Sequence, residues 1–328
     1  MGLFDIFKGK KVDNEMANGE IKLNDNGKLE KLVAEVKKHT AKESYVIDLL
    51  KEKTTLFDSK LGGIPYWDLS KEYPVDNNGN KLILLAQINL EQENFENDKL
   101  PNTGMLQFFV ENEFNCNDKE ANRVIYHENI NKNVTEDDIK GLSIPTTLNS
   151  DIDITIKDEY KIIFKKVKES ISVHDYRFDD ILEKVYNKLY GTNDFDEEFE
   201  KWNEYDVIYD KFADGSGHKL LGYPHFCQED PRSAILYNAS QSNVKLSTSV
   251  SDNGNKTMSW FPSASDMKKI NEENEKKKEL PNFNTLLLQI DSCKEFTWGD
   301  NGQVNVFINP KDLEKLDFSK VLWNFDCY

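Results

Sequence analysis

Residues 60–66 read Lys-Leu-Gly-Gly-Ile-Pro-Tyr, and residues 219–225 read Lys-Leu-Leu-Gly-Tyr-Pro-His. The two stretches share a lysine, a leucine, a glycine and a proline in the same order and at the same spacing. A glycine close to a proline marks a tight turn or a close approach of the backbone. The recurrence of this combination indicates an internal repeat. A repeat is sought first, because it determines the architecture within which the individual strands and helices are assigned.

Three further pairs of stretches follow the two copies in the same order, with one longer gap in the second copy. A single insertion at about residues 226–283 accounts for that gap. Ordered matches of this kind are hard to obtain by chance, so the sequence predicts an internal duplication. The matched pairs are Leu84-Leu-Ala-Gln-Ile-Asn89 with Leu287-Leu-Gln-Ile-Asp291, Gly104-Met-Leu-Gln-Phe-Phe-Val110 with Gly302-Gln-Val-Asn-Val-Phe-Ile308, and Val124-Ile-Tyr126 with Val321-Leu-Trp323.

Each copy contains patterns that are typical of β-strands. Residues 82–90 form an almost unbroken apolar run, as expected of a strand that is buried on both faces. Val304, Val306 and Ile308 alternate with polar residues, which is the period of a half-buried strand. Residues 152–156 alternate in the same way. We therefore expect two sheet-rich modules.

Helices are predicted on either side of these modules. Apolar residues recur between Leu29 and Val36 at the spacing of one helix face, and apolar character continues to about residue 53. Phe178–Tyr190 predicts a second helix with Gly191 as its C-cap. The highly charged stretch Asp266–Glu279 predicts an exposed helix or loop. The predicted fold class is α+β, internally duplicated, with two related sheet-rich modules and flanking helices.

Four segments follow from these patterns. The first is polar and rich in glycine and asparagine, a composition that buries too little apolar surface to fold by itself. The helical connection lies between the two copies and includes the acidic stretch at residues 194–200. We predict a flexible leader at residues 1–26, a helix with the first α+β repeat at 27–165, a helical connection at 166–205, and the second repeat with its insertion at 206–328.

The charge of the chain limits its partners. The 328 residues include 59 acidic and 42 basic side chains, a formal charge of −17 at pH 7. This balance argues against nucleic-acid binding, which needs clustered lysine or arginine to neutralise phosphates. The acidic side chains either simply solubilise the surface or, as the less favoured alternative, attract a basic protein partner such as a toxin. No apolar run reaches the roughly 20 residues that a membrane-spanning helix needs.

The N-terminus and the cysteines bear on location. Residues 3–11 combine Leu, Phe and Ile with lysines and could touch a membrane or partner surface as one amphipathic turn. One turn buries too little apolar surface to anchor a protein, so we favour a tail. There is no signal-peptide pattern, and the 4 cysteines lack C-x-x-C spacing. We expect a cytoplasmic protein with reduced thiols.

Catalytic signatures are missing from the sequence. It has no phosphate-binding glycine loop, zinc-protease motif or nucleophile elbow. His218, His225, Cys227 and Asp230 are of metal-binding types, but their spacing matches no common zinc pattern. We expect no cofactor or metal ion and nominate no catalytic residue. A hydrolase-type enzyme with His218, His225 or Asp300 in its site is the least favoured alternative.

Gln87 and Gln289 occupy matched places in otherwise apolar strands, and a buried amide needs hydrogen-bond partners. We favour the interpretation that each glutamine satisfies the backbone of its own proline loop. The alternative is that the two amides face a cleft between the modules and bind a ligand, which points to binding because glutamine is no useful base or nucleophile. The candidate ligand-binding residues of this cleft are Gln87, Gln289, Tyr66, Trp67, Tyr223, His218, Trp298 and Asp300.

The same motifs resemble the YwqG-like family of uncharacterised bacterial proteins, from about Leu56 to the C-terminus. The resemblance implies an α+β fold with internal duplication and brings no established catalytic residue. It also implies an association with bacterial toxin–immunity systems. It rests on Ser59–Trp67, Gln87-Ile88, Leu100–Phe109, His218–Pro224 with Gln228, Leu286–Asp291, and Trp298-Gly-Asp300 with Gly302 and Phe307.

These observations rank three functions. A non-catalytic binding protein comes first, because the chain is acidic and lacks a catalytic signature. An immunity-type protein that neutralises a basic toxin is the specific form of this hypothesis. A small-ligand or peptide-binding module that uses the cleft between the repeats is the alternative. An enzyme ranks third.

Overall fold

The computed structural model describes residues 23–92, 95, 97, 99–112, 121–149, 155–191, 194–203, 207–233, 247–250, 256–259 and 264–328. Most of the predicted leader, including residues 3–11, lies outside the described residues. So do residues 152–154 of the alternating stretch.

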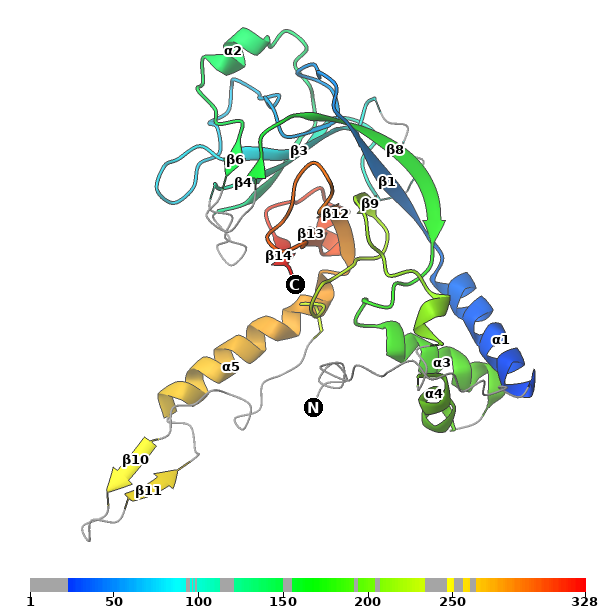
Figure 1. The fold of residues 1–328 in the computed structure, drawn as a ribbon. Coiled ribbons are helices and arrows are strands. Elements are labelled where there is room, and N and C mark those ends of the chain that lie inside the picture. Colours follow the sequence, from blue (N-terminus) through cyan, green and yellow to red (C-terminus); the bar gives the residue numbers. More distant parts are fainter. Residues whose placement is uncertain are drawn as a thin grey trace.

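Ten antiparallel strands form one sheet (Figure 1). They are β1 (Lys42–Leu50), β2 (Lys60–Leu61), β3 (Ile83–Asn89), β4 (Met105–Val110), β5 (Arg123–His127), β8 (Tyr160–Glu169), β9 (Lys219–Leu221), β12 (Thr285–Asp291), β13 (Gln303–Ile308) and β14 (Val321–Asp326). Their order is β14-β13-β12-β9-β1-β8-β2-β3-β4-β5. Two separate two-stranded sheets pair β6 (Leu148–Asn149) with β7 (Thr155–Ile156) and β10 (Ser247–Val250) with β11 (Lys256–Ser259).

The strands on the two sides of the central pair, β1 and β8, follow the same pattern. Each central strand is followed by a short strand and then by three strands that are consecutive in the sequence. Leu220 of β9 lies opposite Tyr45 of β1, and Leu61 of β2 lies opposite Tyr160 of β8. The next strand on each side carries a β-bulge at a matched place, between Leu84 and Ala86 in β3 and between Leu286 and Leu288 in β12.

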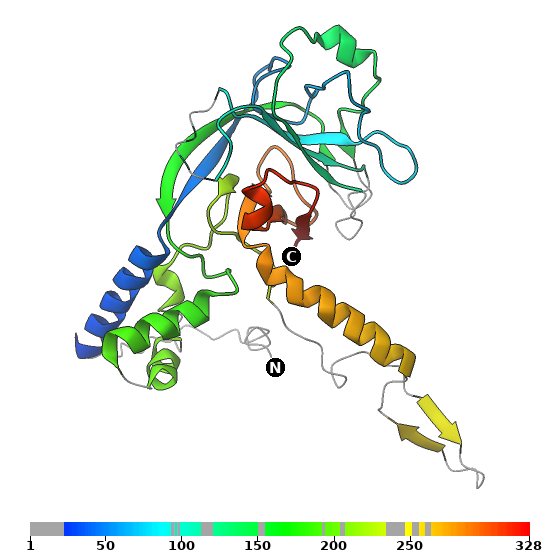
Figure 2. The same cartoon turned by 180° about the vertical axis from the view of Figure 1, so that it is seen from behind.

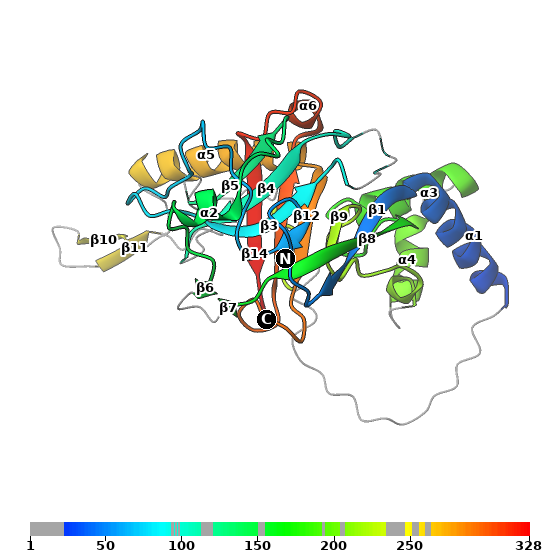
Figure 3. The same cartoon turned by 90° about the horizontal axis from the view of Figure 1, so that it is seen from above.

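The main apolar core lies between the two halves of this sheet. It includes Ile88 and Phe108 from the first half and Ile290 and Trp323 from the second. The rings of Phe108 and Trp323 meet edge to face, with centroids 6.5 Å apart. The sheet therefore folds over on itself, so that β12, β13 and β14 lie against β3 and β4 (Figures 1 and 3). Smaller apolar clusters cover the outer face of each half.

A helical layer packs at one end of the central strands (Figure 2). It consists of α1 (Leu23–Thr40), α3 (Phe178–Tyr190) and α4 (Phe195–Asn203), which share an apolar core with Ile171 and Tyr223. The predicted helix Phe178–Tyr190 is confirmed. Its cap is confirmed as well, because Gly191 has a φ of 65° and donates its N–H to the carbonyl of Asn187.

An arm extends from the second half (Figures 1 and 2). Helix α5 (Ala264–Glu279) runs away from the sheet, with β10 and β11 at its far end, and the 3₁₀ turn η3 (Leu280–Asn282) joins it to β12. Helix α5 is polar on all sides and carries exposed ion pairs such as Lys268–Glu272. The predicted exposed helix within the insertion is therefore confirmed. The remaining short helical segments are α2 (Glu136–Lys140), η2 (Tyr209–Lys211) and α6 (Pro310–Leu313).

The predicted strands at residues 82–90 and 304–308 are confirmed as β3 and β13. The expected half-burial of the second strand is wrong, because Gln303 and Asn305 are buried on the face opposite to the valines. Two other details differ from the sequence analysis. The apolar residues after α1 form strand β1, because the run Tyr45-Val-Ile47 fits a pleated surface better than a helix. The match of residues 124–126 with 321–323 is out of register: Ile125 lies opposite Gln107, and Asn324 lies opposite the matched Asn305.

Within the described residues, no helix has both the length and the apolar character that crossing a bilayer requires.

Gly104 provides a test of how closely the chain packs at the start of β4. Its φ is +88°, and a Cβ placed there would lie 2.3 Å from the carbonyl oxygen of His127. Gly79 has a similar φ of +82°, but a Cβ there would meet nothing within 4 Å. We expect Gly79→Ala to cost about 1 kcal/mol of unfolding free energy, from backbone strain alone. Gly104→Ala should cost about 2 kcal/mol more, because the backbone must also move.

Urea unfolding of the two variants measures this difference directly. Equal losses of stability would show that β4 and β5 can separate without cost and would contradict the packing described here.

Candidate functional site

Gln87 of β3 holds the first proline loop against the sheet. Its side chain is fully buried. Its Oε1 accepts hydrogen bonds from the N–H of Tyr66 at 2.8 Å and from Nε2 of Gln107 at 2.8 Å. Its Nε2 donates to the carbonyls of Leu56 and Asp58, both at 3.0 Å. All four hydrogen-bonding positions of the amide are therefore occupied within the protein.

Gln289 of β12 does the same for the second proline loop. Its Oε1 accepts from the N–H of His225 and from Nδ2 of Asn305, both at 2.9 Å. Its Nε2 donates to the carbonyls of Gly215 at 2.9 Å and Gly217 at 2.8 Å. These partners stand at the places in the second loop that correspond to the partners of Gln87 in the first.

The two amides point away from the core between the halves. Their neighbours Ile88 and Ile290 belong to that core, and adjacent side chains of a strand face opposite sides of the sheet. Each glutamine thus faces its own loop on the outer side of its half, and the structure does not bring the two together. Backbone groups of its own loop, the partners favoured from the sequence, account for three of the four hydrogen bonds of each amide, and the side chain of Gln107 or Asn305 donates the fourth. A ligand-binding role for them stays a prediction.

The aromatic candidates of the first loop are also buried. The hydroxyl of Tyr66 accepts from the N–H of Asn131 at 2.9 Å, and Nε1 of Trp67 donates to the carbonyl of Lys71 at 3.0 Å. Both rings pack edge to face against the imidazole of His127. Burial lowers the pKa of His127 to about 4, so this imidazole is neutral at physiological pH.

The candidate residues of the second half differ in their contacts and burial. Tyr223 donates its hydroxyl to the carbonyl of Thr40 at 2.7 Å and so ties the loop to helix α1. His218 accepts the N–H of Asp291 on its Nδ1 at 3.0 Å. Trp298 is fully buried in the core between the halves, whereas Asp300 is exposed in the turn between β12 and β13. These four side chains have different partners and surroundings, and a ligand-binding role for them stays a prediction.

The lysines of the two loops are both buried, and each donates to the carbonyl four residues later. Lys60 Nζ donates to Ile64 O at 2.8 Å, and Lys219 Nζ donates to Tyr223 O at 3.3 Å. Their remaining partners differ. Lys219 forms an ion pair with Glu169 at 3.1 Å, whereas Lys60 donates to the carbonyl of Thr55 at 2.8 Å.

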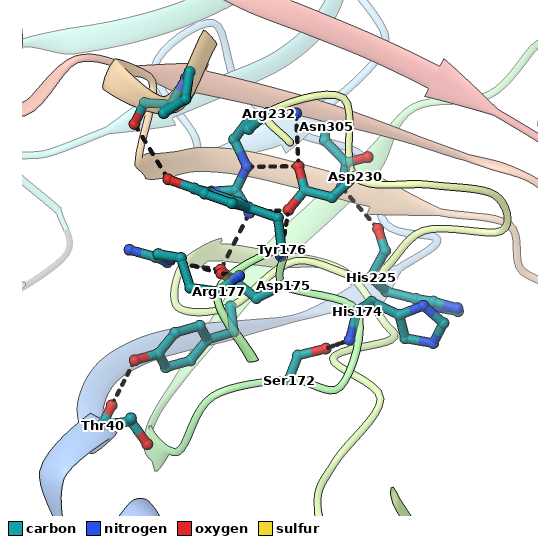
Figure 4. Close-up of polar contacts among 12 residues, drawn as sticks. Thr40, Ser172, His174, Asp175, Tyr176, Arg177, His225, Asp230, Arg232 and Asn305 are labelled. Carbon is teal, nitrogen blue, oxygen red and sulfur yellow. Dashed lines mark hydrogen bonds and ion pairs between the residues drawn. The ribbon is translucent and has the colours of Figure 1, made fainter. Parts of the chain in front are cut away.

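A buried network of two arginines and two aspartates lies beside the second loop (Figure 4). Nη2 of Arg232 donates to Asp230 at 2.5 Å and to Asp175 at 3.1 Å. Arg177 donates to Asp175 from Nε at 2.7 Å and from Nη2 at 2.6 Å. The backbone N–H of Tyr176 also donates to Asp230. The network therefore fastens the chain before α3 to the chain after the second proline loop.

The network has a structural role, because its arginines and aspartates form ion pairs with one another. Arg232 is 1 % exposed, and its guanidinium lies 4.4 Å from the centre of the Phe307 ring. Burial opposes ionisation of Asp175, yet the hydrogen bonds and charges of Arg177 and Arg232 hold its pKa at about 2. A buried carboxylate with two arginines has no capacity left to act as a base at neutral pH.

His174 and His225 stack beside this network, with ring centroids 4.5 Å apart (Figure 4). Burial, reinforced by the neighbouring His225, lowers the pKa of His174 to about 4. Burial also lowers the pKa of His225. Asp230, which the sequence offered as a ligand beside His225 and Cys227, is instead bound to Arg232. In the described part of the chain, no three His, Cys, Asp or Glu side chains gather as metal ligands would.

The thiols of Cys227 and Cys293 are poor nucleophiles. Burial raises the pKa of Cys227 to about 12 and also raises that of Cys293. A thiol with a raised pKa carries little thiolate at neutral pH.

Sequence reasoning missed two groups of residues. Gln107 and Asn305 complete the amide networks, and the matched motifs held the signal, because each stands three residues after its glycine (Gly104 or Gly302). The arginine–aspartate network had a weaker signal. The chain has few arginines, and two of them, Arg177 and Arg232, flank the two segments that the network joins.

Comparison with known families gives one match. The model of a family described as "Domain of unknown function (DUF1963)" matches residues 59–327. Among curated proteins, none matches the chain.

Removing either amide should destabilise the protein. Gln87→Ala leaves the N–H of Tyr66 and two backbone carbonyls without partners, and we expect a loss of about 3 kcal/mol or more. Gln289→Ala should lose a similar amount for the same reason. The exposed Gln228, which makes one side-chain bond to the carbonyl of Cys327, is the control, and Gln228→Ala should cost under about 1 kcal/mol. Chemical denaturation compares the three, and full stability of Gln87→Ala would refute the structural role.

The Asp175 network predicts an acid-sensitive component of stability. The pKa of Asp175 is about 2 in the folded protein, below the value of about 3.9 for an unfolded aspartate. Its contribution is therefore fully present above about pH 5 and is lost as the pH falls through about 2, an effect of about 2–3 kcal/mol.

Asp175→Asn removes this titration, so its unfolding free energy should fall less steeply between pH 5 and pH 2 than that of the wild type. The exposed Asp137 of α2 provides the control, and Asp137→Asn should keep the wild-type slope. Parallel curves for wild type and Asp175→Asn would contradict the prediction.

Proposed function

The chain belongs to the DUF1963 family of unknown function, which residues 59–327 match, and we propose that it is a non-catalytic protein that binds a basic protein partner. The observation that carries this proposal is an acidic surface on the helical layer. Helices α3 and α4 each bury one side against the layer and turn carboxylates to solvent on the other. The exposed carboxylates are Asp179, Asp180, Glu183, Asp196, Glu197 and Glu200.

The charge of this acidic surface differs from that of the arm helix. In the arm helix α5, lysines balance the acidic residues along its length. On α3 and α4 only Lys184, Lys188 and Lys201 oppose the carboxylates. Together with the net charge of −17, the acidic surface attracts a basic partner and speeds its association.

The chemistry of the described residues supports binding over catalysis. The glutamines of both loops bond to the backbone, Asp175 and Asp230 bond to arginines, and the thiol of Cys227 has a raised pKa. Groups that are fully engaged in holding the fold are unavailable for proton transfer or nucleophilic attack.

The narrower assignments belong to the same proposal. The resemblance to the YwqG-like family favours a bacterial immunity-type role in which the bound partner is a toxin. The free thiols of Cys227, Cys293 and Cys327 favour a cytoplasmic location.

We also infer that the fold arose by duplication of one module. The matched strand order, the matched bulges and the matched partners of Gln87 and Gln289 support this inference.

Affinity capture with matched charge variants tests the proposed function. The full-length tagged chain is incubated with native lysate at low and high salt, and bound proteins are identified by mass spectrometry. One variant combines Asp179→Asn, Glu197→Gln and Glu200→Gln. The control removes the same charge from the arm by Glu272→Gln, Glu275→Gln and Glu279→Gln.

A basic protein in stoichiometric amount should bind the wild type and the arm control at low salt and be released at high salt, because exposed charges are screened. The α3–α4 variant should lose it. Equal capture by both variants, or no captured basic protein at all, would exclude the acidic helices as the binding surface.

A further inference from the structure

The two proline loops differ in how they satisfy a pair of hydrogen-bond donors. In the second half, the carboxylate of Glu169 bridges two donors: Oε2 pairs with Nζ of Lys219 at 3.1 Å, and Oε1 accepts the N–H of Tyr223 at 2.7 Å. This carboxylate lies directly over Gly222, where a Cβ would be 1.6 Å from Oε1. A buried lysine ammonium, a backbone N–H and a glycine thus form a cradle for one carboxylate.

The first half has the same donors without the bridging carboxylate. Lys60 and Ile64 stand where the second half has Lys219 and Tyr223. Lys60 uses two of its three ammonium hydrogens on the carbonyls of Thr55 and Ile64. Its third hydrogen and the N–H of Ile64 have no acceptor among the described residues.

The nearest carboxylate in the first half is turned elsewhere. Glu159 lies over Gly63, as Glu169 lies over Gly222. However, Glu159 accepts from both the N–H and the hydroxyl of Thr54, each at 3.1 Å. It makes no ion pair with Lys60 in the described structure. The first cradle therefore has a carboxylate over its glycine, but this carboxylate bridges neither Lys60 nor the N–H of Ile64.

A pocket lies beside Lys60 and Ile64. Its volume is about 70 Å³, and Lys60, Thr54, Ile64 and Glu159 line it together with Lys53, Leu56 and Glu136. Lys60 is only 1 % exposed, so its ammonium is shielded from bulk water at the base. Lys53 is exposed and places a second positive charge at the rim. The volume suits a carboxylate with one or two carbons attached.

We propose that this pocket binds a carboxylate group of a ligand, which pairs with Nζ of Lys60 and with the N–H of Ile64 as Glu169 does with Lys219 and Tyr223. The chemistry is shared by free small carboxylates and by the C-terminal carboxylate of a peptide. The site is separate from the acidic helices and does not depend on the proposed function.

The charge balance of the pocket sets its pH dependence. Burial lowers the pKa of Lys60 to about 8, against the opposing effects of Glu159, Asp58 and Glu136. A bound carboxylate adds negative charge beside the ammonium and favours its protonated form. Binding should therefore be strongest below pH 8 and weaken above it, as the empty site loses its proton.

Nuclear magnetic resonance of the full-length wild-type protein with acetate as the probe tests the site without a substitution. The amide signal of Ile64 and the side-chain signals of Lys60 should shift in a saturable way, and more at pH 7 than at pH 9. Tyr223 and Lys219 serve as internal controls, because Glu169 already fills their cradle, and chloride at equal ionic strength controls for salt. If acetate leaves the amide signal of Ile64 unshifted, the proposal is wrong.

Two variants sharpen the result. Lys60→Met should weaken acetate binding about tenfold or more, since a charge-assisted hydrogen bond is lost. Glu169→Ala should open the second cradle, so that acetate now also shifts Tyr223 and raises the melting temperature of this variant. If Lys60→Met folds and binds acetate as well as the wild type, the assigned site is wrong. If it does not fold, the wild-type shifts of Ile64 decide.

Peptides distinguish the source of the carboxylate. A short peptide with a free C-terminus is compared with its C-terminal amide by the same Ile64 signal. Binding of the free acid that is tighter than that of acetate, with no binding of the amide, assigns a protein C-terminus. A response to acetate alone assigns a small free carboxylate. A response to the amide equal to that of the free acid contradicts carboxylate recognition.

Discussion

The fold depends on two buried amides that satisfy irregular backbone. A loop with glycine and proline cannot pair its own N–H and C=O groups as a strand does, and leaving them unpaired in the interior costs about 1–3 kcal/mol for each group. Gln87 and Gln289 remove that cost by bonding two carbonyls and one N–H of their loops. Because each amide comes from a central strand of its half, it also fixes the position of its loop on the outer face of the sheet.

Both halves use a buried glutamine to hold the proline loop, but the two loops contact different parts of the protein. The second loop holds the helical layer: Tyr223 donates to Thr40 of α1, and the chain after this loop reaches Asp175 through Arg232. The first loop packs against a local cluster with Trp67 and Phe109 instead. The second half therefore needs a rigid loop, which the bridge of Glu169 supplies.

The sequence was sufficient for the elements that carry a period or a repeat. The strands at residues 82–90 and 304–308 and the helix with its Gly191 cap follow from local patterns. Strand β1 could not be predicted so simply, because its apolar residues follow a helix without a turn signal and its pairing with β8 is distant in sequence. The arginine–aspartate network and the stacked imidazoles were also beyond reach, since they join residues from segments whose proximity only the fold decides. For the glutamines, the sequence correctly identified the residues that hold the loops, but it could not tell that they face opposite outer sides.

Glu159 and Glu169 leave the two loop lysines in different electrostatic surroundings, because only Glu169 forms an ion pair with the lysine of its loop. A carboxylate that bridges a buried lysine and a backbone N–H stabilises its loop, because it neutralises a charge that burial penalises. Where the helical layer requires a rigid loop, that carboxylate is built into the chain. In the first half Glu159 bonds to Thr54, so no carboxylate of the described residues forms an ion pair with Lys60. The ammonium of Lys60 donates to two carbonyls instead, which satisfy hydrogen bonds without neutralising its charge. A bound carboxylate would supply the ion pair that Lys219 obtains from Glu169.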